Sequence, residues 1–256
     1  MYNDLDFWRR GKSSHLLTQE LVLRLVSWIK ETVLTGGGEG VVFGLSGGID
    51  SAVVAVLCKR AFPETTLGLI MPCYSDKADR EYAEMVANKF DISTNIIVLD
   101  KVYDSLIKIL PDSDDMVNKQ EAEANIKPRL RMVTLYYFAN SRNYLVVGTS
   151  NKSELSVGYF TKYGDGGADL IPLGDLVKQQ VRKLASFLKV PEEIIEKPPS
   201  AGLWKGQTDE GQLGLTYKEL DHYLTTCNAD EVVKKRIDTM IHNSAHKRNV
   251  PLIFRS

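Results

Sequence analysis

The chain has 256 residues, of which 43% are hydrophobic and 25% are charged, and its formal net charge is −1. This composition is ordinary for a globular protein with a sizeable core, and the near-zero charge argues against a nucleic-acid binder, which is usually basic. The chain has neither the roughly 18 consecutive apolar residues of a membrane helix nor a secretory signal at its start, so we expect no membrane partner.

The chain contains three cysteines, Cys58, Cys73 and Cys227. They are odd in number and widely spaced, so they form neither a disulfide framework nor a C-x-x-C pair. This usage favours a reducing compartment, and we expect a cytoplasmic protein.

Hydrophobic periodicity predicts an alternation of helices and strands. The expected helices cover residues 16–34, 52–57, 76–90, 102–110, 117–141, 174–189, 217–224 and 229–241. The expected strands cover residues 41–45, 66–71, 95–99 and 144–147. Such alternation implies a doubly wound, mostly parallel sheet with helices on both faces. We expect a single domain over residues 1–256, with a C-terminal helical segment at 216–256.

Two polar, glycine-containing segments, residues 161–169 and 202–214, interrupt the pattern. We expect both to be mobile loops, and loops of this kind often close over active sites. A solvated surface turn explains their composition equally well.

The most informative stretch is Ser46-Gly47-Gly48-Ile49-Asp50-Ser51, which ends the first strand and opens a helix. Free backbone N–H groups and the helix dipole make such a corner suitable for a phosphate. The Asp50 carboxylate would repel an anion unless a divalent cation stood between them, which favours ATP with Mg²⁺. Thr149 follows the fourth strand at an equivalent place. Ligands of such sheets lie at the carboxyl ends of strands, so Thr149 is a second candidate contact.

This loop resembles the S-G-G-x-D-S pyrophosphate loop of the N-type ATP pyrophosphatases. Four further segments, taken in their order along the chain, indicate which enzymes of this group the chain resembles most. They are Gly148-Thr149-Ser150-Asn151-Lys152-Ser153-Glu154, Phe160-Thr161-Lys162-Tyr163-Gly164-Asp165-Gly166-Gly167-Ala168-Asp169, Pro172-Leu173 and His246-Lys247-Arg248. Together they resemble the ammonia-dependent NAD synthetases over almost the whole chain.

The resemblance implies an adenine nucleotide alpha hydrolase-like fold and the last step of NAD biosynthesis. In that step the nicotinate carboxylate of deamido-NAD is adenylated by ATP, with release of pyrophosphate, and ammonia then displaces AMP. Mg²⁺ is the implied cofactor and ATP the co-substrate. Glutamine-dependent relatives carry an extra N-terminal amidase domain. Only about forty residues precede the first strand here, too few for such a domain, so we expect free ammonia as the substrate.

The resemblance also implies roles for individual residues at the nucleotide end of the site. Asp50 and Glu154 would bind Mg²⁺, and Asp50, Lys178 and Asp165 would be catalytic, with Asp165 positioning or deprotonating ammonia. The implied ATP-binding residues are Gly44, Leu45, Ser46, Gly47, Gly48, Ile49, Asp50, Ser51, Thr149, Lys178 and Ser200. Ser200 stands where the family usually has threonine. Gly202 stands where a carboxylate is expected, so no role is assigned to it.

The implied deamido-NAD-binding residues are Arg129, Lys162, Asp169, His246 and Lys247, and a homodimer is implied as well. Taken singly, Arg129 or Lys178 would more often be a solvated surface charge. Glu154 alone would be a carboxylate that the helix dipole favours. Only the ordered set indicates a site.

Two other functions stay open at this point. A tRNA-modifying ATP pyrophosphatase would need a basic RNA surface and, commonly, reactive cysteines, and neither is evident in the sequence. A non-catalytic adenine-nucleotide-binding module would keep the fold but lack the paired metal carboxylates and the glycine-rich segment.

Overall fold

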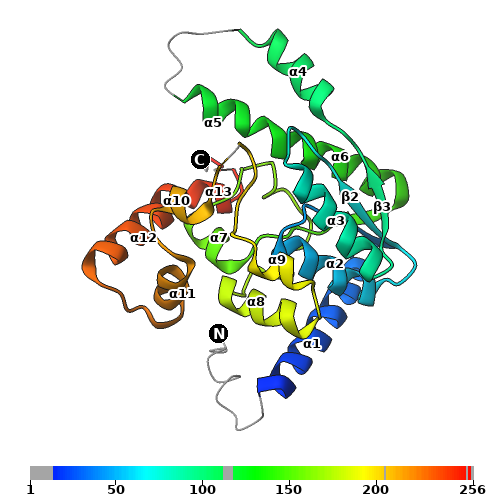
Figure 1. Ribbon diagram of the computed structural model, residues 1–256, viewed down its shortest axis with the longest axis horizontal. Helices are drawn as coiled ribbons and strands as arrows, with labels where there is room; N and C mark the ends of the chain where they lie inside the picture. Colours follow the sequence, from blue (N-terminus) through cyan, green and yellow to red (C-terminus); the bar gives the residue numbers. More distant parts are fainter. Residues whose placement is uncertain (1–13, 112–117, 205, 252, 255–256) are drawn as a thin grey trace.

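The computed structural model describes residues 14–111, 118–204, 206–251 and 253–254. Its sheet contains the strands β1 (Gly40–Gly44), β2 (Thr66–Ile70), β3 (Ser93–Ile96) and β4 (Tyr144–Val146). All pairs are parallel, in the order β3-β2-β1-β4 (Figure 1). The sheet order changes direction between β1 and β4, which is where open parallel sheets bind their ligands.

Helices cover both faces of this sheet because successive side chains of a strand point to opposite sides. Val41 and Phe43 of β1 point into one core, and Val42 points into the other. The first core is closed by α1 (Ser14–Thr35), α2 (Ile49–Ala61), α3 (Lys77–Lys89), α8 (Lys178–Phe187) and α9 (Glu192–Glu196). The second is closed by α4 (Asp100–Ile109) and α6 (Ile126–Arg142). The expected doubly wound fold is therefore confirmed.

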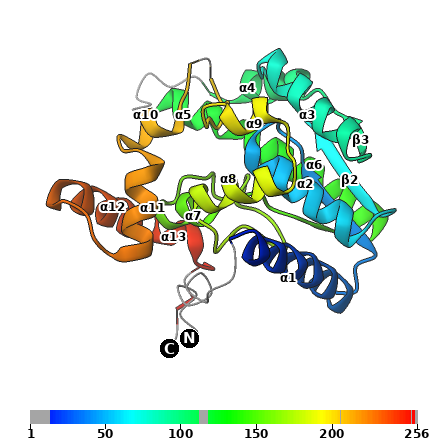
Figure 2. The same ribbon diagram turned by 60° about the horizontal axis from the view of Figure 1, so that its bottom comes forward.

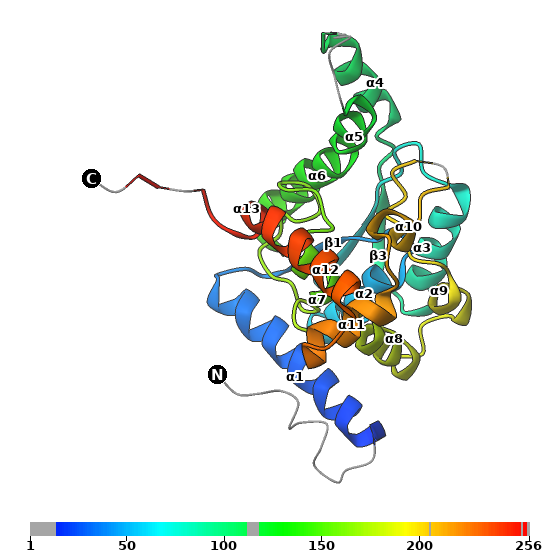
Figure 3. The same cartoon turned by 90° about the vertical axis from the view of Figure 1, so that its left-hand side faces the viewer.

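A third apolar cluster lies to the side of the sheet (Figure 2). It joins α7 (Lys152–Val157), α11 (Tyr217–Thr226) and α12 (Glu231–Asn243) through Val157, Leu220 and Ile237, which are buried. The remaining short helices are α5 (Lys119–Ala124), α10 (Asp209–Leu213) and α13 (Ala245–Arg248). In Figure 3, α6 lies beside the sheet, and α5 and α4 continue beyond its end, away from the sheet.

Several predicted boundaries were wrong. The strand expected at 95–99 lies at 93–96, although Ile97 N still donates to the carbonyl of Ile70, the last residue of β2, and Leu99 N to that of Pro72, at 2.9 Å each. The helix expected at 174–189 begins only at Lys178, because turns occupy the residues before it. Residue 117, the first of the long expected helix, lies outside the described residues.

That long helical region is divided at Asn125 into α5 and α6. Pro128 lies in the first turn of α6, where its missing N–H costs nothing, so a new helix begins there. The segment 202–214 was expected to be a loop but contains α10, and α7, α9 and α13 were not predicted. All four are short, and short helices show little periodicity in the sequence. Within the described residues, no helix combines the length and apolarity needed to cross a membrane.

Candidate active site

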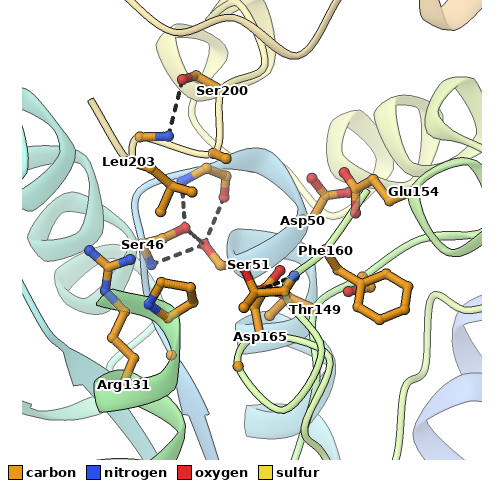
Figure 4. Close-up of a pocket in the computed structure, with 18 of the residues that line it drawn as sticks. Ser46, Asp50, Ser51, Arg131, Thr149, Glu154, Phe160, Asp165, Ser200 and Leu203 are labelled. Carbon is orange, nitrogen blue, oxygen red and sulfur yellow. Dashed lines mark hydrogen bonds between the residues drawn. The ribbon is translucent and has the colours of Figure 1, made fainter. Parts of the chain in front are cut away.

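A cavity of about 600 Å³ opens at the carboxyl ends of β1, β2 and β4 (Figure 4). The structure brings most of the predicted site residues to its wall. These are Gly44, Leu45, Ser46, Gly48, Ile49, Asp50, Ser51, Arg129, Thr149, Glu154, Lys162, Asp165, Lys178, Ser200, His246 and Lys247. Gly47 and Asp169 are the two predicted residues outside this lining.

The Ser-Gly-Gly loop is held by hydroxyl groups rather than by a capping side chain. Ser51 Oγ donates to the Gly48 carbonyl at 2.8 Å and accepts from Ser46 N at 3.2 Å and Ser46 Oγ at 3.0 Å. No side chain caps the start of α2 at Gly48. The first backbone N–H groups of α2 therefore face the cavity without a capping oxygen, as an anion site requires.

Gly47 supports the loop from behind. Its φ of 78° lies in the left-handed region, and a Cβ there would collide with the Asp79 carbonyl of α3. Only glycine combines this conformation with so close an approach. Gly47 thus shapes the loop, although it does not line the cavity.

Three charged side chains meet at the centre of the cavity wall. Lys178 Nζ lies 2.6 Å from Asp50 Oδ2 and 3.0 Å from Glu154 Oε1. Asp50 lies in the first turn of α2, Glu154 in the first turn of α7, and Lys178 is the first residue of α8. Three helix N-termini converge here, and their dipoles favour negative charge.

Asn151 connects two of these elements. Its Oδ1 accepts from Glu154 N at 3.1 Å, and its own backbone N donates to Glu154 Oε2 at 3.2 Å, which makes a capping box at the start of α7. Its Nδ2 donates to Asp50 Oδ1 at 2.9 Å. This fully buried amide, which the sequence interpretation did not assign, fixes the separation of the two carboxylates.

The three charges of the cluster affect one another's protonation. Burial, together with the charge of Asp50, raises the pKa of Glu154 to about 7, against the opposing effect of Lys178. Burial alone would lower the pKa of Lys178, but Asp50 and Glu154 raise it above its ordinary value. The ammonium therefore stays protonated, and a second cation beside these carboxylates would be stabilised.

The carboxylate oxygens of Asp50 and Glu154 are the ligands that Mg²⁺ prefers. In the part of the chain that the structure describes, no group of three or more His, Cys, Asp or Glu side chains could hold a metal. A cation on these two carboxylates would therefore need water and substrate oxygens to complete its shell, as Mg²⁺ in nucleotide sites does.

Another part of the cavity wall is cationic. Lys247 Nζ donates to the carbonyls of Gly158 and Phe160, at 2.9 and 3.0 Å, and burial lowers its pKa. Lys162 Nζ donates to the His246 carbonyl at 2.7 Å, and Arg129 Nε donates to the Lys162 carbonyl at 3.4 Å. Carbonyl partners carry no formal charge, so this wall keeps its positive charge for an anionic ligand.

The two aspartates of the glycine-rich segment differ in position. Asp165 lines the cavity, where its Oδ1 accepts from Thr161 N at 2.9 Å, and desolvation by the surrounding protein raises its pKa (Figure 4). Asp169 Oδ2 instead accepts from Val146 N at 2.7 Å, and its Oδ1 accepts from Tyr136 OH at 3.0 Å. Within one chain, Asp169 is therefore hydrogen-bonded to β4, the strand at the edge of the sheet, and does not line the cavity.

Ser200 lies in a segment that crosses one side of the cavity. Its Oγ donates to the Gln207 carbonyl at 2.7 Å and accepts from Gly202 N at 3.1 Å. Lys127 Nζ donates to the Leu203 carbonyl at 2.7 Å, which connects the segment to α6. The hydroxyl of Ser200 is therefore engaged in the turn of this segment.

Arg131 also lines the cavity, and the sequence interpretation missed it. Its Nε donates to the Met71 carbonyl at 3.1 Å and its Nη2 donates to Ser75 Oγ at 3.2 Å. The only sequence signal was a second arginine two positions after Arg129. An isolated helical arginine is usually solvated, so that signal was too weak to use.

A doubly wound parallel sheet with a glycine loop, a paired-carboxylate cluster and a cationic wall at its switch point defines a nucleotide-binding α/β protein of the adenine nucleotide alpha hydrolase class. The comparison with known families is more specific. Residues 21–251 match the family described as NAD synthase, and the chain belongs to that family.

Individual relatives agree with this assignment. The chain is 49% identical over 233 residues to an NH(3)-dependent NAD(+) synthetase of Carboxydothermus hydrogenoformans, covering 91% of this chain and 96% of that protein. Among solved structures, the NMN synthetase from Francisella tularensis is 37% identical with a TM-score of 0.87, over 93% of this chain and 99% of that one. The NH3-dependent NAD synthetase from Campylobacter jejuni, in complex with the nitrate ion, is 32% identical with a TM-score of 0.78, over the same shares.

Proposed function

We propose that this chain is an ammonia-dependent NAD synthetase, which amidates deamido-NAD with ATP and ammonia to give NAD, AMP and pyrophosphate. The observation that carries the proposal is a single cavity that joins the Asp50–Lys178–Glu154 cluster and the Ser-Gly-Gly loop to a cationic wall. Such a cavity suits two phosphorylated substrates at once. ATP would lie on the loop side, and the dinucleotide would lie along the cationic side.

In the first step the nicotinate carboxylate oxygen attacks the α-phosphorus of ATP, and the bond to pyrophosphate breaks. The departing diphosphate gains negative charge, so groups that meet this charge lower the barrier. Backbone N–H groups at the start of α2 and the Lys178 ammonium would meet this charge. The Ser46 and Ser51 hydroxyls would contribute by giving up their hydrogen bonds within the loop. Arg131, which also lines the cavity, would add a further positive charge.

The donor set of Asp50 and Glu154 fits Mg²⁺, which when bound would neutralise phosphate charge and help to orient the triphosphate. The two carboxylates come from separate helix starts, and Asn151 holds Asp50 beside the cap of α7. A nucleotide entering this site without a cation would meet their negative charge. Mg²⁺ is therefore part of the proposal.

In the second step ammonia attacks the carbonyl carbon of the adenylated nicotinate, and the bond to AMP breaks. The attacking nitrogen must lose a proton. Asp165 lies in the cavity with a raised pKa, which makes it a stronger base than an ordinary aspartate. We assign it the role of positioning or deprotonating ammonia.

The family resemblance implies roles for the remaining residues. Thr149 and Ser200 would contact ATP, and Arg129, Lys162, His246 and Lys247 would hold deamido-NAD. Asp169 would reach the dinucleotide only if a second copy of the chain brought a substrate to the sheet edge. That geometry, and the large exposed side chains Val133 and Tyr137 on α6, support the proposal of a homodimer. We further propose one domain and, from the three free cysteines, a reducing cytoplasmic location.

The activity is tested by incubating the protein with ATP, MgCl₂, deamido-NAD and ammonium, and by following products with chromatography. AMP and NAD should appear in equal amounts. Formation of ADP in place of AMP would contradict the proposal. Purified glutamine should not replace ammonium, and equal rates with the two nitrogen sources would refute dependence on free ammonia.

The structural similarity to an NMN synthetase favours one second candidate, amidation of the corresponding nicotinate mononucleotide. This substrate lacks the adenylate half, so it would leave part of the cationic wall without a phosphate. Comparing kcat/KM for the mononucleotide and the dinucleotide separates the two functions. A higher value for the mononucleotide would replace the leading proposal.

A further inference from the structure

Tyr217, at the start of α11, lies between several groups of the cluster. Its hydroxyl is 3.3 Å from Glu154 Oε1 and 2.8 Å from Asp209 Oδ2, and Lys178 Nζ lies 4.9 Å from the centre of its ring. Its side chain is buried. Tyr217 therefore contacts the Glu154 carboxylate by a hydrogen bond and the Lys178 ammonium by a cation–π contact.

Asp209 is the partner that holds the Tyr217 hydroxyl. This aspartate is only 4% exposed, and it accepts from Tyr217 OH and, at 3.0 Å, from Tyr159 OH. A buried carboxylate is costly unless its oxygens accept hydrogen bonds. The two tyrosine hydroxyls supply these bonds, so Asp209 and Tyr217 constrain each other.

Asp209 also connects the cluster to the segment that carries Ser200. Tyr159 OH lies 2.5 Å from Gln212 Oε1, which accepts from Gln207 Nε2 at 2.6 Å. The Gln207 carbonyl accepts from Ser200 Oγ at 2.7 Å. A continuous path of hydrogen bonds therefore runs from Glu154 through Tyr217 and Asp209 to the segment over the cavity.

The position of Tyr217 is itself set by Asp221, one turn later on the same face of α11. Asp221 Oδ1 accepts from Ser153 Oγ at 2.5 Å, and its Oδ2 accepts from Gln179 N at 2.8 Å. Ser153 precedes Glu154, and Gln179 follows Lys178. Asp221 thus joins α11 to the starts of α7, which carries Glu154, and α8, which carries Lys178.

We propose that Tyr217 is a positioning residue for Glu154 and Lys178, with Asp209 as its partner, and that this pair connects the segments 199–204 and 206–214 to the cation site. The proposal rests on the proposed function, because it concerns the same site. Neither residue needs to touch substrate. Their effect is to hold Glu154 where it can bind a divalent cation and Lys178 where it can meet phosphate charge.

The test compares Tyr217→Phe with Tyr223→Phe. Tyr223 lies on the same helix, and its hydroxyl donates to Asp238 at 2.6 Å, away from the cluster. Binding of Mn²⁺ is measured by electron paramagnetic resonance in the presence of α,β-methylene-ATP, which cannot be cleaved at the α-phosphorus. Tyr217→Phe should weaken Mn²⁺ binding about tenfold, as loss of a partner of a metal ligand commonly does. Tyr223→Phe should stay within twofold.

Turnover gives a second readout. The Mg²⁺ concentration for half-maximal AMP release should rise in Tyr217→Phe, with the KM for deamido-NAD unchanged. Unchanged Mn²⁺ affinity with a lowered melting temperature would show a purely structural role and overturn the proposal, as would equal losses in both tyrosine variants. Mn²⁺ binding is measured without turnover, so the comparison of the two tyrosine variants stays valid even if the protein does not catalyse the proposed reaction.

A second variant tests the pair if Tyr217→Phe does not fold. Asp209→Asn keeps the size of the side chain but leaves only one oxygen to accept from two tyrosines. It should weaken Mn²⁺ binding in the same direction. Wild-type affinity in Asp209→Asn would refute the pairing of the two residues.

Discussion

Single side chains determine the charge balance of this site. Lys178 neutralises one of two half-buried carboxylates, so the cluster of Asp50, Glu154 and Lys178 keeps a net negative charge that a divalent cation can offset. Each member lies in the first turn of a helix, where the exposed N–H groups add positive potential. Removing one charge therefore changes both metal binding and the orientation of the lysine.

Asp50→Asn should lower turnover by about 100-fold, since it removes one carboxylate from the cation and one partner from Lys178. Nucleotide binding should remain measurable, because the backbone of the loop is unchanged. The measurement is AMP release under saturating substrates. Asp175→Asn is the control, because Asp175 forms an exposed ion pair with Lys152, outside the cluster. Full activity in Asp50→Asn would indicate that Asp50 is not part of the site.

The raised pKa of Glu154 predicts a pH dependence of stability in metal-free protein. Its pKa is about 7 when folded and 4.5 ordinarily, so folding favours the protonated acid. This contribution is fully present below pH 4.5 and is lost as the pH rises through 7. Urea unfolding in EDTA should therefore show wild-type stability falling over this range relative to Glu154→Gln. Parallel profiles of the two proteins would contradict the prediction.

At the scale of elements, the site depends on how helices begin. The loops that follow β1 and β4 place the starts of α2 and α7 in the cavity wall, and α8 begins beside them. Backbone shape is as important here as side-chain chemistry. Gly47 is the residue at which the loop before α2 touches α3 most closely.

Gly47→Ala should destabilise the protein more than Gly37→Ala. Both glycines have similar φ, 78° and 76°, so each alanine would pay about 1–2 kcal/mol for a left-handed conformation. Only at Gly47 would the new methyl group meet backbone, which adds about 1–3 kcal/mol. Urea unfolding of the two variants measures the difference. Equal losses would mean that the contact with α3 is not tight.

At the scale of the whole molecule, the proposed dimer concerns exposed apolar residues of α6 and the edge of the sheet. Val133 and Tyr137 are 61% and 69% exposed, one turn apart on α6. Asp169 lies at the sheet edge, away from the cavity of its own chain. A second copy would cover the apolar residues and would bring another surface towards this edge.

Sedimentation equilibrium at micromolar concentration should therefore give twice the mass of one chain. Tyr137→Lys, which places a charge on this exposed helix face, should shift the equilibrium towards the monomer. Lys108→Glu, on α4, changes charge at an exposed position and is the control. A monomeric wild-type protein would remove the dimer from the proposed function.

The sequence was most informative where local chemistry and periodicity agreed. The buried strand before Ser46, the glycine loop and the helix after it are consecutive in the chain, so their arrangement was predictable. The positions of Arg131, Tyr159, Asp209 and Tyr217 were not. Each of these contacts the site through partners that are distant in the sequence, and none stands in a distinctive local pattern. Asn151 does stand in a quoted segment, three residues before Glu154, but its hydrogen bond to Asp50 depends on the tertiary structure.

The amino-acid sequence by itself determined the class of fold, the glycine loop after β1 and the family, because these depend on short-range periodicity and on ordered motifs. Only the tertiary structure decided that Lys178 bridges Asp50 and Glu154, that Tyr217 connects this cluster to Asp209, and that Asp169 lies away from the cavity. The physical reason is that hydrogen bonds and ion pairs depend on distances of a few ångströms between atoms. Helix packing sets those distances, and a linear pattern of residues does not contain them.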